Sequence, residues 1–189
     1  MSSMKLYLFY FLLFSQIGLI AQEAASYQIR TVAFYNLENL FDTKNDTLIF
    51  DDDRTPTGKD HWTEERYINK VAQMSKVISE IGSIENKTAP DIIGVCEVEN
   101  LSVLQDLVHH SNLFQTNYGI IHFDSPDERG IDVALLYKKD AFIPVNFNSH
   151  RLLLFDLDGK RNYTRDQLIV EGLLDNEKIY FLVNHWPSR

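Results

Sequence analysis

Residues 91–97 read DIIGVCE, a short apolar run that begins directly after Pro90. Its apolar residues are consecutive rather than alternating with polar ones, which is typical of a strand buried on both faces. Cys96 lies inside the run, and we interpret it as a small buried strand residue. This stretch decides the fold class, because a strand buried on both faces needs helices or a second sheet around it.

Helix patterns lie on both sides of this strand. Upstream, residues 63–82 predict a helix whose apolar residues recur every three or four positions, with Thr63 as its N-cap and Gly82 at its exit. Downstream, residues 100–110 predict a second helix with Leu101 on its apolar face. Further strand-like runs are found at 29–35, 118–123, 131–137, 152–155, 168–174 and 179–183, the last two joined by a hairpin. The order predicts an α/β fold with a mixed sheet. Two helices can cover only one face of that sheet, so the other face would be left uncovered.

Composition limits the function. The chain has 189 residues, enough for one domain, and a formal net charge of −9. This charge argues against a dedicated basic surface for nucleic acid, although a bound divalent cation can supply local positive charge to a phosphate substrate. Cys96 is the single cysteine of the sequence, so it has no disulfide partner within the chain.

The first 21 residues predict a signal peptide. Lys5 precedes an apolar stretch from Leu6 to Ile20, and Ala21 is a small residue at which cleavage could occur. The stretch is too short for a comfortable membrane span, so we expect no stable membrane insertion after cleavage. Residues 22–189 would then form a periplasmic or secreted protein, with an uncleaved anchor as the alternative.

Polar residues follow three of the predicted strands. They are Asn36 in FYNLENLFD, Glu97 in GVCEVEN and His185 in VNHWPS. Carboxylate and amide oxygens are hard ligands that suit Mg²⁺ or Ca²⁺. An imidazole beside them could hold a phosphate oxygen or move a proton. Ordinary capping and turn roles at strand ends are the alternative explanation.

Other kinds of site fit the sequence less well. The histidines lack His-x-x-x-His spacing and the cysteine is single, so a zinc site is not expected. Asp51, Asp52 and Asp53 resemble the start of a calcium loop, but Pro56 stands where that loop needs glycine. We therefore expect a solvated acidic loop there. Ser188 is not in a Gly-x-Ser-x-Gly nucleophile elbow.

Four segments in order carry a family resemblance: VAFYNLENLFD (32–42), DIIGVCEVEN (91–100), RGIDVALLY (129–137) and NHWPSR (184–189). Together they resemble the endonuclease/exonuclease/phosphatase superfamily of deoxyribonuclease I-like proteins, from about residue 31 to residue 189. The loop TPTGKDHWTEERY (55–67) is similar to an exported bacterial branch. The resemblance implies a four-layer α/β sandwich, in which two packed mixed sheets carry outer helices. It places the site at the edge where both sheets present their loops.

The resemblance also implies roles for individual residues. Asn36 matches an asparagine at the metal and phosphate site, and Glu97 matches the glutamate that binds the divalent cation. His185 matches the residue that contacts the scissile phosphate or helps protonate the leaving group. Ser188 and Arg165 match phosphate contacts. The implied cofactor is Mg²⁺, with Ca²⁺ or Mn²⁺ as alternatives.

Two further segments of the family pattern, Gly-Asp-x-Asn and Ser-Asp-His, do not occur in the 189 residues. We therefore expect residues 22–189 to be the N-terminal part of such a domain, weakly active or inactive on its own. The complete protein would be a monomeric, exported, endonuclease-like phosphodiesterase that acts on a phosphoester, with DNA as one candidate substrate. A non-catalytic exported binding module or a decayed fragment is the alternative. Asp132 belongs to the signature without an implied chemical role, and a structural role is equally open for it.

Overall fold

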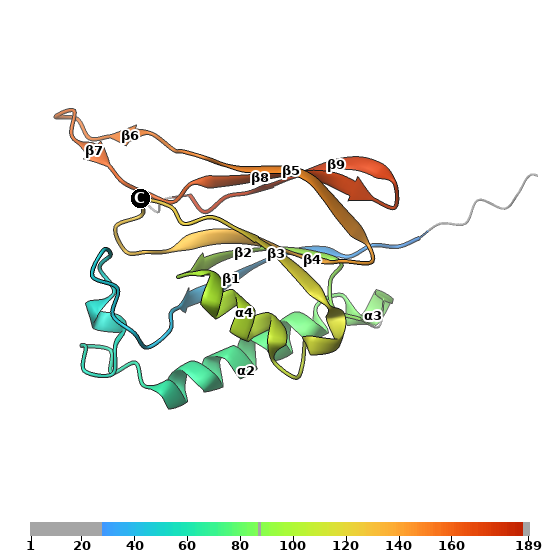
Figure 1. The fold of residues 1–189 in the computed structure, drawn as a ribbon, viewed down its shortest axis with the longest axis horizontal. Coiled ribbons are helices and arrows are strands. Elements are labelled where there is room, and N and C mark those ends of the chain that lie inside the picture. The colour runs from blue at the N-terminus through green and yellow to red at the C-terminus, as the bar shows by residue number, and fades with distance from the viewer. Residues whose placement is uncertain (1–27, 87, 187–189) are drawn as a thin grey trace, which may run out of the picture.

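A computed structural model describes residues 28–86 and 88–186 of the chain. These residues form three layers: two helices, a four-stranded sheet and a three-stranded sheet (Figure 1). The predicted signal peptide at 1–21 and the predicted phosphate contact Ser188 lie outside the described residues.

The four-stranded sheet, here called the inner sheet, forms the middle layer. Its first two strands are parallel and its other neighbours are antiparallel. In spatial order the strands are β1 (Val32–Leu40), β2 (Ile92–Val98), β4 (Asp132–Lys138) and β3 (Tyr118–His122). β2 therefore lies between two strands, and Cys96 is buried within it, as the sequence predicts.

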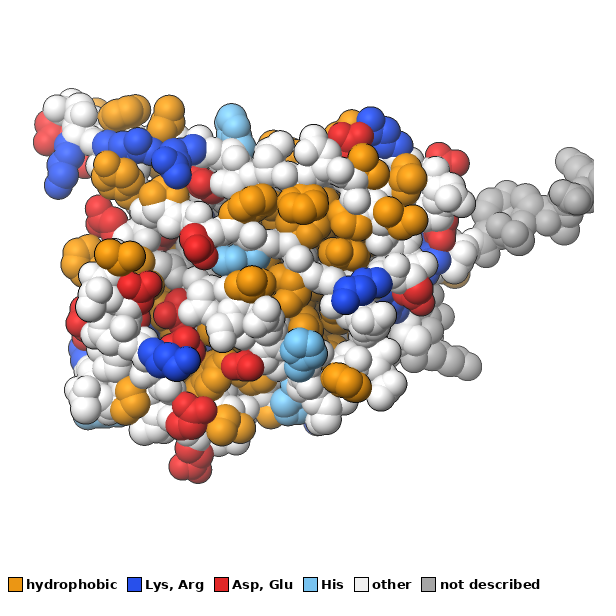
Figure 2. All heavy atoms as spheres, viewed as in Figure 1, with side chains coloured by type: hydrophobic (Ala, Val, Ile, Leu, Met, Phe, Trp, Pro, Cys, Tyr) orange, Lys and Arg blue, Asp and Glu red, His pale blue; other side chains and the backbone are white. Residues whose placement is uncertain are grey.

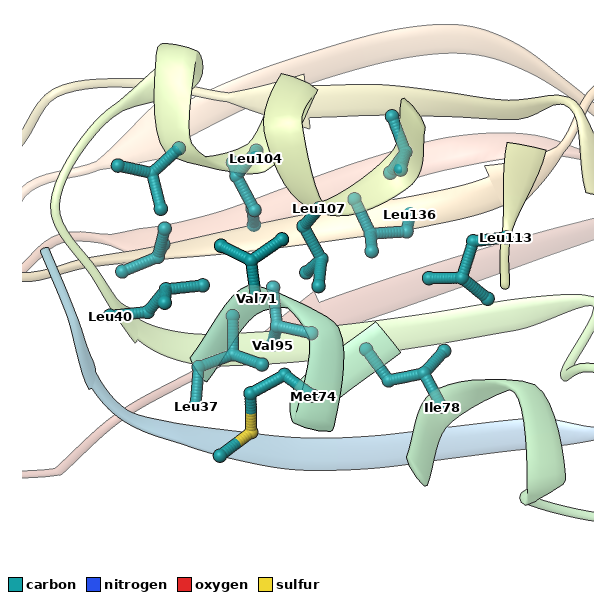
Figure 3. Packing of buried hydrophobic residues seen from close by; sticks show 14 of the residues in the cluster. Leu37, Leu40, Val71, Met74, Ile78, Val95, Leu104, Leu107, Leu113 and Leu136 are labelled. Atoms are coloured by element: carbon teal, nitrogen blue, oxygen red, sulfur yellow. The ribbon is translucent and has the colours of Figure 1, made fainter. Parts of the chain in front are cut away.

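Helices α2 (Glu64–Glu80) and α4 (Leu101–His109) cover one face of the inner sheet (Figure 3). The Thr63 side chain accepts a hydrogen bond from the Arg66 N–H, and Gly82 follows the helix with φ of +71°, so both predicted ends of α2 are confirmed. Leu101 was wrongly expected on the apolar face of α4, because it is 45% exposed. The buried face of α4 consists of Val103, Leu104, Leu107 and Val108.

The three-stranded sheet, here called the outer sheet, has the order β5 (Phe142–His150), β8 (Gln167–Leu174) and β9 (Glu177–Val183). Asp175 and Asn176 join β8 to β9 with φ of +51° and +69°, which confirms the predicted hairpin. β5 was not predicted, because its polar residues and a bulge after Pro144 obscure the alternation. The expected strand at 152–155 is reduced to β6 (Leu154–Phe155), which pairs with β7 (Arg161–Asn162). The remaining short elements are η2 (Asp52–Arg54), α3 (Ser83–Asn86) and η3 (Phe114–Thr116).

The two sheets pack face to face through a second apolar core that includes Phe142, Val170 and Val183. The opposite face of the outer sheet has no helix on it among the described residues, and Tyr180 and Leu182 on that face are exposed. The structure thus confirms the predicted α/β sandwich with one uncovered face. Among the described helices, none combines the length and the apolar character that a membrane crossing requires.

Candidate functional site

Glu97 and His185 meet at one end of the sandwich, although they come from different sheets. Glu97 lies near the end of β2, and His185 lies two residues beyond β9. The His185 Nε2 atom is 3.3 Å from Glu97 Oε1, and the two side chains are 19% and 18% exposed. The structure therefore brings together two of the three residues that the sequence singles out at strand ends.

A β-bulge directs Glu97 toward His185. Cys96 pairs with Val133 and Val98 pairs with Asp132, so Glu97 is an extra residue in the ladder, and its φ is +59°. Strict alternation would place Glu97 on the helix-covered face, opposite to the face that Cys96 shares with the outer sheet. A left-handed glutamate is strained, and such strain is typical of functional sites.

Asn36 lies beside this bulge on the neighbouring strand. It pairs with Cys96 across the parallel ladder, and its Oδ1 atom accepts a hydrogen bond from the Glu38 N–H at 2.7 Å. Glu38 and Asn39 are also left-handed, with φ of +54° and +60°. Strand β1 thus continues past its predicted end at residue 35 and carries Asn36 to the same edge as Glu97.

Gly94 allows β9 to approach β2 closely enough for this site to form. A Cβ atom on Gly94 would lie 3.2 Å from Phe34 Cδ2 and 3.2 Å from Val183 Cγ1, which is tight for both neighbours. Because Val183 ends β9, its contact with Gly94 fixes the point at which the chain leaves the outer sheet toward His185.

Arg165 anchors the segment that carries His185. It is 6% exposed, and its Nε donates to the His185 carbonyl at 2.6 Å. Its Nη2 donates to the Trp186 carbonyl at 3.0 Å, and its Nη1 donates to Asp127 Oδ2 at 3.2 Å. The sequence suggested a phosphate contact for Arg165. The structure shows instead a guanidinium that holds the backbone of residues 185–186 and the buried carboxylate of Asp127. The sequence did not indicate a role for Asp127.

The environment of His185 favours its neutral form. Burial lowers the pKa of His185, the nearby charge of Arg165 lowers it further, and Glu97 opposes both effects. The His185 Nδ1 atom is buried and has no hydrogen-bond partner among the described residues. A neutral imidazole at this position could accept or pass on a proton.

An acid-lined cavity of about 600 Å³ lies beside the site, on the side of the 45–51 loop. Its acidic lining residues are Asp46, Glu99, Asp124, Asp127, Glu128 and Asp132. Figure 2 shows acidic side chains gathered on the left of the molecule, at the end where these loops meet. The expected solvated loop was wrong for Asp51, which is 1% exposed because it folds back to accept a hydrogen bond from the Asp46 N–H.

Asp132 connects β4 to the loop before it. Its Oδ2 lies 3.0 Å from His122 Nε2, and its Oδ1 accepts hydrogen bonds from both the N–H and the hydroxyl of Ser125. His122, Asp124 and Asp132 have potential ligand atoms within 4.8 Å of one another, the only such group in the described part of the chain. Since both oxygens of Asp132 already have partners, the geometry agrees with a structural role.

Glu97 is better suited to hold a metal ion. No lysine or arginine among the described residues forms an ion pair with its carboxylate, and the titratable side chain that it contacts is the imidazole of His185. A partly exposed carboxylate is an oxygen ligand of the kind that Mg²⁺ or Mn²⁺ prefers, and Asn36 pairs with the adjacent Cys96 on the neighbouring strand. Water and substrate would complete the shell. The residues present therefore fit the predicted divalent cation.

Comparisons with known proteins identify the family of the chain. The model of the Endonuclease/Exonuclease/phosphatase family matches residues 31–189. No curated protein matches the chain. Solved structures that resemble it include a humanized D. rerio TDP2, at 12% identity over 85% of this chain and 48% of that one, with a TM-score of 0.47.

Two structures from Bacteroides thetaiotaomicron are also similar. One is an endonuclease/exonuclease/phosphatase family protein, at 19% identity over 81% of this chain and 47% of that one, with a TM-score of 0.44. The other is a mannosyl-6-phosphatase, at 18% identity over 82% of this chain and 49% of that one, with a TM-score of 0.42. The chain spans about half the length of these structures.

Proposed function

Because the chain belongs to the Endonuclease/Exonuclease/phosphatase family, we propose that it is part of a divalent-metal-dependent phosphoesterase. The finer proposal is an exported, endonuclease-like phosphodiesterase that acts as a monomer in the periplasm or outside the cell. The observation that carries the phosphoesterase proposal is the 3.3 Å approach of His185 Nε2 to Glu97 Oε1, which joins two sheets at a strained bulge.

The residues of the site would divide the chemistry between them. Glu97, with Asn36 beside it, would hold the divalent cation, which when bound neutralises phosphate charge and stabilises the leaving oxygen. Asn36 could also donate its amide N–H groups to a phosphate oxygen. His185, kept neutral by its surroundings, would hold or move a proton at the phosphate. Arg165 would fix His185 in place through the backbone carbonyls at 185 and 186.

The test compares hydrolysis by the full-length protein with Mg²⁺ and with a chelator. The substrates are plasmid DNA and sugar or lipid phosphoesters, so that the substrate class is read in the same experiment. We expect Glu97→Gln to lower activity by about 100-fold or more, since even partners of metal ligands typically contribute 10–100-fold. The matched control is Glu128→Gln, an exposed carboxylate near the site. Activity that survives chelation, or that Glu97→Gln leaves intact, would refute the metal-dependent mechanism.

A further inference from the structure

A cationic hollow lies along the first half of α2. It has a volume of about 280 Å³. We call it the α2 patch and define it by Trp62, Arg66, Asn69, Lys70 and Gln73, which line it together with Glu38 and Met74. Arg66 and Lys70 are one helical turn apart and both lie over the Trp62 ring, at 5.2 Å and 5.8 Å from its centroid.

The two cations of the α2 patch have no carboxylate partner within the described residues. Arg66 donates through Nη1 to the backbone carbonyls of Asp60 and His61, and Lys70 donates to the backbone carbonyl of Glu38. Nearby Arg54 differs, because its Nε lies 3.3 Å from Asp60 Oδ2. Arg66 and Lys70 are thus held by neutral oxygens and keep their net positive charge, in a chain whose formal net charge is −9.

The α2 patch adjoins the candidate catalytic site. Lys70 contacts the carbonyl of Glu38, two residues beyond Asn36 on the same strand. Burial lowers the pKa of Lys70, the neighbouring cations Arg54 and Arg66 lower it further, and the carboxylates of Glu38 and Glu97 oppose this shift. A substrate with its scissile phosphate at Glu97 could therefore place a neighbouring anion on the patch.

The charges around the site favour the α2 patch over the acid-lined cavity as the place for that anion. The acid-lined cavity contains Asp46, Glu99 and Asp127, and would repel a second phosphate. The α2 patch supplies a guanidinium, an ammonium and the amide groups of Asn69 and Gln73, all of which donate hydrogen bonds to phosphate oxygens. Trp62 is buried beneath the cations, so it supports them rather than offering a stacking surface.

We propose that the α2 patch binds a second, non-scissile phosphate of the substrate. This inference rests on the proposed function and narrows it to substrates that carry at least two phosphates. Neighbouring nucleotides of a nucleic-acid strand offer this chemistry, and so does a multiply phosphorylated small molecule. The patch would bind phosphate oxygens and no base, so it could accept a phosphate from either kind of substrate.

Equilibrium titration of the full-length protein tests the patch without turnover. The probes are thymidine 3′,5′-bisphosphate and thymidine 5′-monophosphate, titrated with a chelator present. We expect the wild type to bind the bisphosphate about 10-fold more tightly, and Lys70→Gln or Arg66→Gln to remove that difference while monophosphate affinity stays unchanged. Lys70→Arg should keep the preference. Lys76→Gln, an exposed charge on another face of α2, is the matched control and should have no effect.

Salt dependence and a second set of substrates complete the test. Removal of one phosphate-binding charge should lower the slope of log affinity against log salt by about 1. Oligothymidylates and an inositol bisphosphate, compared as Mg²⁺-dependent substrates, identify which source is used, and Lys70→Gln should raise KM with little change in kcat.

The outcomes separate this inference from the function on which it rests. Equal wild-type affinity for bisphosphate and monophosphate would overturn the patch, as would a variant that weakens both probes equally. A bisphosphate preference without hydrolysis of any phosphoester would retain the patch and refute the phosphoesterase. Hydrolysis without that preference would retain the phosphoesterase and refute the patch.

Discussion

Replacement of Arg165 by methionine should destabilise the protein strongly, because the arginine holds two backbone carbonyls and a buried carboxylate together. Arg165 donates to two backbone carbonyls and to the Asp127 carboxylate, which is 4% exposed. Removing one partner of a buried ion pair costs about 3–5 kcal/mol, because the remaining charge stays buried without that partner. Methionine keeps much of the apolar stem, so the loss reports on the guanidinium rather than on a cavity.

Arg129 provides the matched control for this prediction. Its Nε lies 3.4 Å from the same Asp127 carboxylate, but its side chain is 57% exposed. An exposed ion pair contributes about 0–1 kcal/mol, so Arg129→Met should change little. The measurement is urea unfolding of the full-length protein at neutral pH, with the free energy of unfolding compared among wild type and both variants. A loss below about 1 kcal/mol for Arg165→Met, or equal losses in the two variants, would refute the anchoring role.

Three further predictions concern single residues. Burial raises the pKa of Cys96 to about 11, so iodoacetamide should label it at neutral pH only as fast as the protein opens, and rapid labelling of the folded protein would contradict the burial. Asn176 has φ of +69°, so Asn176→Ala should lower the free energy of unfolding by about 1–2 kcal/mol while Asn176→Gly stays close to wild type; equal losses would argue against a backbone cause. The pKa of His185 lies below its ordinary 6.5, so the folded state binds this proton less readily than the unfolded chain. The neutral imidazole therefore contributes fully to the free energy of unfolding above pH 6.5, and this contribution decreases as pH falls. His185→Gln should therefore weaken the acid sensitivity of metal-free protein in urea unfolding at a series of pH values, and an unchanged pH profile would contradict the lowered pKa.

Local patterns predicted the elements that depend on local physics. Thr63 and Gly82 set the ends of α2, and the continuous apolar run around Cys96 indicated a central strand. The candidate site was also partly predictable, because Glu97 and His185 each follow an apolar run and polar side chains at strand ends gather at one sheet edge.

Other features depend on contacts between distant segments. Strand β5 is stabilised by pairing with β8 rather than by its own alternation, so its sequence contains a weak signal. The bulge at Glu97 can be predicted only when the pairing of β2 with β4 is known. The burial of Asp51 depends on a hydrogen bond from the Asp46 N–H. The pairing of Arg165 with Asp127 joins residues 38 positions apart, and composition gives no indication of it.

The bulge at Glu97 also has an evolutionary consequence. Side chains alternate along a strand, so deletion of one residue between Cys96 and Val98 would restore a regular ladder and remove the carboxylate that faces His185. The spacing of these residues should therefore be under stronger selection than the identity of their apolar neighbours. Among relatives that retain catalysis, an alignment should show substitutions at the positions of Val95 and Val98, but no gap between them.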